Sequence, residues 1–409
     1  MAASRHVRPT DLRAVAQLAT QATRSVTRVV EGVHQSVWST LGVRGTVPGQ
    51  TGGITGFVYR TVHGVTELVG KGLQAALTPL EPLLAALVDA PPETPQREAV
   101  LAALNGVMGD RLAESHNPLA TPMTLRYQGQ ALHWGHLPTM SNVNGKVLLL
   151  IHGLCMNDLQ WHTTADDGTV AGHGSTLAAT LGYTPVYVRY NTGLHTSENG
   201  HLLASQLAQL VQHWPVPVQE ITVVAHSMGG LVTRSAVVSA QQSGAPWLKH
   251  LKNIVFLGTP HHGAPLERAG NWIDTLLGST PYTRPFARLV QLRSAGITDL
   301  RYGHVVDADW QGHDRFRRKP DTRVPLPLPP GIACFTVAAA MAGARSALAE
   351  RLLGDGLVPL NSALGQHGEA HRSLVFAKTS QRVMVRLNHM ELLSAPQVGA
   401  QLIAWLTPG

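Results

Sequence analysis

Residues 221–231, ITVVAHSMGGL, are the stretch on which the fold prediction depends. Residues 221–225 are β-branched or small apolar residues, the composition of a strand buried on both faces. Ser227 follows in a small-x-Ser-x-Gly pattern, and residues 234–242 have a helical composition. Small residues two positions either side of Ser227 allow a sharp strand-to-helix turn that exposes the hydroxyl beside the unpaired N–H groups of the helix. The stretch therefore predicts a nucleophilic serine; the alternative is an ordinary glycine-rich turn.

The composition indicates a large, ordered α/β protein. Of the 409 residues, 44% are hydrophobic and 14% are charged, which permits a large core and argues against disorder. The net charge of +7 suggests an anionic surface nearby, and because no nucleic-acid motif accompanies it, we expect no nucleic-acid partner. Two cysteines, Cys155 and Cys334, are too few for a disulfide framework.

Strand and helix patterns alternate through most of the chain after residue 120. The expected strands, besides residues 221–225, are 147–151, 184–190, 253–257, 332–337 and 373–377. Helical segments between them predict a mostly parallel sheet covered on both faces. Residues 123–137 predict a hairpin at the sheet edge. Residues 264–330 interrupt the alternation, and we expect them to form a cap or lid over the active site.

The first part of the chain predicts a helical extension. Residues 10–38 and 54–77 have apolar positions at three- and four-residue spacing, and this basic leader suits peripheral contact with a membrane through residues 1–80, with packing on the catalytic domain as the alternative. We assign residues 1–115 to the extension and residues 120–409 to the catalytic domain. No apolar signal region and no run of 18 apolar residues is found, so the expected location is cytoplasmic, with the inner membrane face left open. The oligomeric state stays open.

Three residues occur in the chain order Ser, acid, His, which is the order found where the nucleophile stands on a strand–turn–helix of a parallel sheet. Acyl transfer by serine needs a base for the serine proton and a carboxylate that orients the base. Asp355 follows the penultimate expected strand between two glycines, and His389 follows the last one. Ser227, Asp355 and His389 are therefore the predicted catalytic triad. The competing acids are Asp299, Asp307 and Asp309, all in the expected lid.

Backbone N–H groups are expected to bind the oxyanion. One is that of Met228, directly after the nucleophile, and the other is that of Leu154 in the loop after strand 147–151, with Cys155 as the competitor. Further residues expected at the substrate lie in the same motif loops; they are His152, Gly153, Cys155, His226 and His261.

Five motifs carry a family resemblance. They are HGLCMN (152–157), AHSMGG (225–230), GTPHHG (258–263), GDGLVP (354–359) and NHMELL (388–393). Together they resemble the bacterial triacylglycerol lipases and esterases and the PGAP1-like family of α/β-hydrolases, over about residues 120–409. The resemblance implies an α/β-hydrolase fold with Asp355 and His389 as triad members. Many of those lipases hold Ca²⁺; Glu391 matches one ligand position, but no acid stands in 324–349, so Ca²⁺ is not expected.

The predicted function is hydrolysis of carboxylic esters by a lipase or carboxylesterase through an acyl-enzyme. The alternatives are a phospholipase, a thioesterase or a polyester depolymerase with the same triad, and, from another class, a membrane-associated binding protein without activity. We expect no cofactor and no metal. Zinc at His195 with His201, or at His261 with His262, is the weaker option because the spacing is not that of a typical site.

Overall fold

The structure is a computed structural model that describes residues 93–137, 140–164, 170–264, 294–314, 321–341 and 354–408. The helices expected within residues 1–92, and the membrane contact expected there, lie outside these ranges. The chain divides into two compact units, and the unit that contains the sheet comprises residues 98–114 and 120–409. The expected boundaries at 115 and 120 stay a prediction. Among the described helices, none has the length and apolar character needed to cross a membrane.

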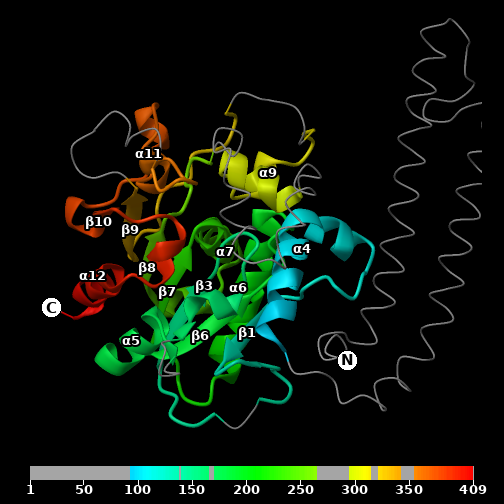
Figure 1. The fold of residues 1–409 in the computed structure, drawn as a ribbon, viewed down its shortest axis with the longest axis vertical. Coiled ribbons are helices and arrows are strands. Elements are labelled where there is room, and N and C mark those ends of the chain that lie inside the picture. The colour runs from blue at the N-terminus through cyan, green and yellow to red at the C-terminus, as the bar shows by residue number, and fades with distance from the viewer. Residues whose placement is uncertain are drawn as a thin grey trace, which may run out of the picture. The chain divides into compact units, whose positions relative to one another are not determined.

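An eight-stranded sheet forms the centre of this unit (Figure 1). Its strand order is β10-β9-β8-β7-β3-β6-β1-β2. The strands are β1 (Thr124–Tyr127), β2 (Gln130–Ala131), β3 (Lys146–Ile151), β6 (Thr184–Arg189), β7 (Glu220–His226), β8 (Leu251–Leu257), β9 (Ala333–Ala340) and β10 (Gln381–Val385). All neighbours from β10 to β6 pair in parallel, and β1 pairs antiparallel with β6 and β2. The predicted mostly parallel sheet and the edge hairpin are confirmed.

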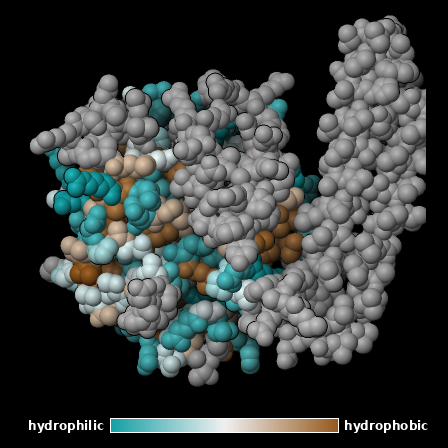
Figure 2. All heavy atoms as spheres, viewed as in Figure 1, coloured by the Kyte–Doolittle hydropathy of each residue, from teal (hydrophilic) through white to brown (hydrophobic). Residues whose placement is uncertain are grey.

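Helices cover both faces of the sheet, as the two-sided burial of its strands requires. Helices α4 (Pro95–Glu114), α6 (Thr196–His213) and α7 (Met228–Ser243) contribute to the core cluster on one face. Helices α5 (His173–Leu181) and α12 (Pro396–Leu406) contribute to the cluster on the other face. Figure 1 shows α5 and α12 together on one side of the sheet. On the face drawn in Figure 2, hydrophilic residues are interspersed with smaller hydrophobic patches.

The strand predicted at residues 373–377 is wrong. Leu374 and Phe376 are buried in the core, but the Leu374 N–H donates to Gly365 O at 2.8 Å rather than to a sheet partner. The last strand is instead β10, at the sheet edge, where Val383 and Val385 are exposed. An edge strand of this kind lacks the continuous apolar run that marks the buried strands.

The insertion between β8 and β9 is described in part. Helix α9 (Ala295–Tyr302), the 3-10 helix η5 (Asp307–Asp309) and residues 321–332 belong to it. The chain of β8 therefore leaves the sheet for a long excursion before β9 pairs beside it. Its role as a lid stays a prediction.

Candidate active site

Ser227 occupies a strained position between β7 and α7. Its φ of 54° lies in the left-handed region, which is uncommon for a residue with a side chain. Its N–H donates to Leu257 O on β8 at 2.8 Å, and its residue caps the N-terminus of α7. The predicted strand, turn and helix around Ser227 are therefore present, with the serine at the positive end of the helix dipole.

The small residues around Ser227 have a steric reason. A Cβ atom on Gly229 would lie 2.7 Å from the carbonyl oxygens of both Ile151 and His152, and one on Gly230 would lie 2.0 Å from Thr259 Oγ1. Real Cβ atoms do not come so close, so α7 approaches β3 and the end of β8 only because these positions are glycine.

Asp355 and His389 form a buried hydrogen-bonded pair. His389 Nδ1 lies 2.6 Å from Asp355 Oδ2, and both side chains are about 1% exposed. Asp355 Oδ1 accepts the N–H groups of Leu357 at 3.0 Å and Val358 at 2.8 Å, so both carboxylate oxygens are held in place. Because Nδ1 is engaged, the opposite ring nitrogen, Nε2, is the atom of His389 that can exchange a proton with another group.

The ends of four neighbouring strands bring these groups to one edge of the sheet. Ser227 follows β7, Asp355 follows β9 and His389 follows β10, and all three strands run in parallel. His226 Nε2 donates to His389 O at 3.1 Å, and the two imidazole rings lie 4.6 Å apart. Gly258, after β8, lies against the imidazole of His389. The triad candidates thus all stand at the carboxyl edge, where α/β sheets place their sites.

The loop after β3 lies beside Ser227. A Cβ on Gly153 would come within 2.9 Å of Ser227 Cβ. The Cys155 N–H already donates to Thr192 Oγ1 at 3.1 Å. In the described parts of the chain, neither the Leu154 N–H nor the Met228 N–H is paired with an acceptor. Of the two N–H candidates in the loop, Leu154 is the one whose donor is available for an oxyanion.

Two of the three competing acids, Asp299 and Asp309, are engaged elsewhere. Asp299 is fully buried and lies 3.0 Å from His195 Nδ1 and 2.9 Å from His304 Nδ1. Burial alone would raise the pKa of Asp299, but the hydrogen bonds from the two histidines lower it overall. Asp309 accepts two backbone N–H groups, those of Val305 and Val306. Asp355 is the acid that contacts His389.

The other residues expected at the substrate are buried. His152 stacks on Tyr190 with ring centroids 4.4 Å apart, and burial lowers its pKa to about 4. Burial likewise lowers the pKa of His226 well below its usual value, and it raises that of Cys155 to about 12, so this thiol stays protonated. His261 packs in the core against the rings of Phe256 and Phe376. Direct contact of His152, Gly153, Cys155, His226 or His261 with substrate stays a prediction.

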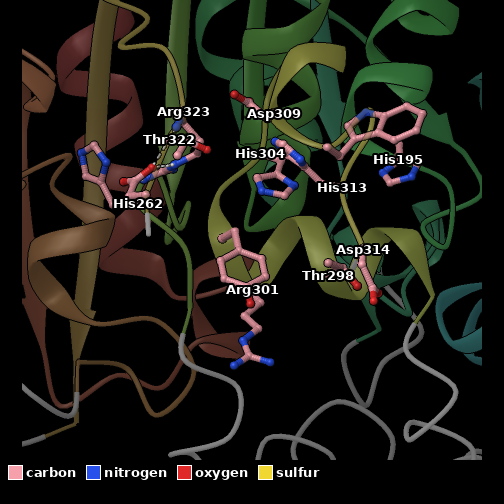
Figure 3. Close-up of a pocket in the computed structure, with 13 residues that line it drawn as sticks. His195, His262, Thr298, Arg301, His304, Asp309, His313, Asp314, Thr322 and Arg323 are labelled. Carbon is pink, nitrogen blue, oxygen red and sulfur yellow. Dashed lines mark hydrogen bonds and ion pairs between the residues drawn. The ribbon is translucent and has the colours of Figure 1, made fainter. Parts of the chain in front are cut away.

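A cavity of about 490 Å³ lies in the described part of the insertion (Figure 3). His195, Thr298, His304, Trp310 and Arg323 are among the residues that line it, whereas no member of the triad does. Trp310 stacks on His195 with ring centroids 3.6 Å apart. The residues that line it are of polar, charged or aromatic types. Within the described residues, no three His, Cys, Asp or Glu side chains are grouped so that they could hold a metal ion.

The structure also shows a group of buried charged residues that the sequence analysis did not select. They are Glu98, Arg126, Asp158 and Arg189. Arg189 stands in the apolar strand segment VYVR, and Asp158 directly follows the HGLCMN motif. A charge inside a strand expected to be buried on both faces is a signal of a buried ion pair, although it does not identify the partner.

The mostly parallel sheet with helices on both faces defines the fold class: the chain has an α/β-hydrolase fold, as predicted. The family model described as "PGAP1-like alpha/beta domain" matches residues 142–323, slightly less than half of the chain. This match confirms the predicted resemblance to the PGAP1-like family. Curated proteins gave no significant match.

Solved structures of lipases and esterases are similar at low identity. The mature Bacillus licheniformis lipase BlEst2 is 17% identical with a TM-score of 0.41, over 70% of this chain and 98% of that one. Aspergillus fumigatus lipase B is 11% identical with a TM-score of 0.39, over 68% of this chain and 54% of that one. A thermophilic esterase from Thermogutta terrifontis is 15% identical with a TM-score of 0.35, over 64% and 90%.

Proposed function

We propose that the chain is a serine hydrolase that cleaves carboxylic esters. The observation that carries the proposal is the buried Asp355–His389 pair, 2.6 Å between its atoms, at the sheet edge where the strained Ser227 begins helix α7. A catalytic role for these three residues explains why an uncommon backbone conformation and a buried carboxylate occur together at this edge.

In the proposed mechanism, Ser227 Oγ attacks the ester carbonyl while His389 Nε2 accepts its proton. Asp355 keeps the proton of the imidazole on Nδ1 and stabilises the imidazolium that forms. The N–H groups of Leu154 and Met228 bind the oxyanion. His389 then gives its proton to the leaving alcohol, and afterwards activates water that releases the acid from Ser227.

The proposed substrates are the carboxylic esters that a lipase or a carboxylesterase cleaves. A phospholipase, a thioesterase and a polyester depolymerase would use the same three residues. A series of p-nitrophenyl esters from acetate to palmitate, followed by a phospholipid, an acyl thioester and a polyester, separates these alternatives for the full chain. Contact of residues 1–80 with a membrane and a cytoplasmic location remain proposals that vesicle binding and cell fractionation would test.

The test of the proposal is Ser227→Ala in the full chain. We expect kcat for the best p-nitrophenyl ester to fall by about 10⁴- to 10⁶-fold, because the nucleophile is removed. Labelling by a fluorophosphonate probe should be lost in the same variant. Ser243→Ala is the matched control: this serine lies on the same helix and its hydroxyl bonds to Ser239 O. A wild-type chain that is folded yet neither labelled nor active on any of these esters would overturn the proposal and favour a binding protein.

A further inference from the structure

Four buried charged side chains meet beside the loop after β3, at residues 152–158. Arg189 Nη1 lies 2.8 Å from Glu98 Oε2, and its Nε donates to Asp158 Oδ1. Arg126 Nε lies 3.2 Å from Asp158 Oδ2. Each of these residues is at most 6% exposed. The group joins α4, β1 and β6 to the end of the loop.

Stability alone does not account for such a group. Removing four charges from water is expensive, and well-packed apolar side chains of similar volume stabilise a protein as well or better. Paired arginine and carboxylate groups also fix the relative positions of the segments that carry them, because the planar guanidinium binds carboxylates in a fixed geometry. The question is therefore which part of the molecule needs a fixed position at this place.

The loop is held on both sides of Leu154. After Leu154, the Cys155 N–H donates to Thr192 Oγ1 at 3.1 Å, and a Cβ on Gly106 of α4 would lie 2.2 Å from Cys155 Sγ. Two residues further along, Asn157 Nδ2 donates to Glu98 O at 3.0 Å. Before Leu154, His152 O accepts the hydroxyl of Tyr190 at 2.8 Å. Every one of these restraints acts on the loop that carries the proposed oxyanion donor.

We propose that Glu98 and Arg189 are positioning residues for the reaction at Ser227. Through Asp158 they fix the loop of residues 152–158, so that the Leu154 N–H keeps its direction when charge develops on the carbonyl oxygen. Helix α4 thereby serves the chemistry without contacting the substrate. The inference rests on the proposed ester hydrolysis.

The first experiment measures Glu98→Gln in the full chain. This substitution keeps the shape of the side chain and removes one charge of the group. We expect kcat to fall by about 10- to 100-fold with KM changed far less, because an oxyanion donor acts in the transition state and a small misplacement is costly there. The rate of fluorophosphonate labelling of Ser227 should fall in the same ratio. Glu369→Gln, which breaks the exposed pair of Glu369 with Arg372, is the matched control and should leave kcat unchanged.

A second, milder perturbation covers the case in which Glu98→Gln does not fold. Thr192→Val removes the hydroxyl that accepts the Cys155 N–H and should also lower kcat, whereas Thr192→Ser keeps the hydroxyl and should restore it. Val398→Ala on α12 serves as a destabilised reference variant, at a position far along the chain from the loop. It should lower the melting temperature but leave kcat unchanged at temperatures where the protein is folded.

Hydrogen exchange separates the failure of this inference from that of the proposed function. In wild type we expect the peptide of residues 152–158 to be protected, and in Glu98→Gln and Thr192→Val to exchange faster. Variants that are destabilised but keep both wild-type kcat and wild-type exchange in this peptide would overturn the inference. Altered exchange together with a wild-type chain inactive on every ester would overturn the proposed function instead.

Discussion

Replacing Asp355 by Asn is expected to move the proton of the neutral His389 ring from Nδ1 to Nε2. Asp355 Oδ1 accepts two backbone N–H groups, those of Leu357 and Val358. In the variant, the amide oxygen must stay toward these donors, because turning the NH₂ group to them would leave two buried N–H groups unpaired at about 1–3 kcal/mol each. The NH₂ group then faces His389 Nδ1, which must accept a hydrogen bond instead of donating one.

The consequence for the reaction follows from the imidazole itself. With Nδ1 as an acceptor, the single proton of the neutral ring lies on Nε2, which is then unable to take the proton of Ser227. We expect kcat to fall by about 10⁴-fold at neutral pH, with the fold unchanged. The assay is hydrolysis of the preferred p-nitrophenyl ester under saturating conditions, with circular dichroism as the check on folding.

Asp299→Asn is the matched control for this prediction. Asp299 is also a fully buried carboxylate, and it is bonded to two histidines, His195 and His304. Its loss should reduce stability but change kcat by less than about tenfold, because none of these residues takes part in the proposed reaction. If Asp355→Asn kept activity within tenfold of wild type, or if Asp299→Asn lost as much, the assignment of Asp355 as the catalytic acid would be refuted.

Two further predictions concern acid stability and the loop after β3. Burial lowers the pKa of His152 to about 4, whereas in the unfolded chain the pKa is near 6.5, so the unfolded chain binds the proton more readily. The contribution of His152 to the free energy of unfolding is therefore fully present above pH 6.5. It is lost as the pH falls toward 4. This group alone should remove about 2 kcal/mol between pH 7.5 and 5.0, measured by urea unfolding, and equal stability at both values would contradict the assigned burial. Gly153→Ala should lower kcat by about 10²-fold, because the new Cβ would lie 2.9 Å from Ser227 Cβ. Gly368→Ala, whose Cβ would meet nothing within 4 Å, is the control and should keep full activity.

The sheet and its order along the chain were predictable because buried parallel strands carry continuous apolar runs. Val147–Ile151 and Ile221–Ala225 are such runs, and both become central strands. β10 was missed since an edge strand is half exposed and shares no such run. Residues 373–377 were mistaken for a strand because apolar side chains can also be buried when their backbone is irregular, as that of Phe376 is.

The triad candidates were selected because each stands in a short motif next to a strand end. Ser227, Asp355 and His389 stand at one edge of the sheet because the parallel strands that precede them end there. The partners of Arg189 were not predictable in this way. Glu98 is 91 residues away from Arg189, and a sequence does not state which buried charges pair across such a separation. The bond of Asp299 to His195 and His304 is likewise a product of tertiary packing.

The order of strands in the sheet has a consequence for biosynthesis. The strands of this sheet that are made first are β1, β2, β3, β6 and β7; they are neighbours in the sheet, and they are already followed by Ser227 and the loop with Leu154. Asp355 and His389 are made later, after β9 and β10 respectively. At about 5–20 residues per second, the ribosome needs on the order of ten to thirty seconds to extend the chain from Ser227 to His389. A nascent chain thus carries its serine well before it has the proposed base.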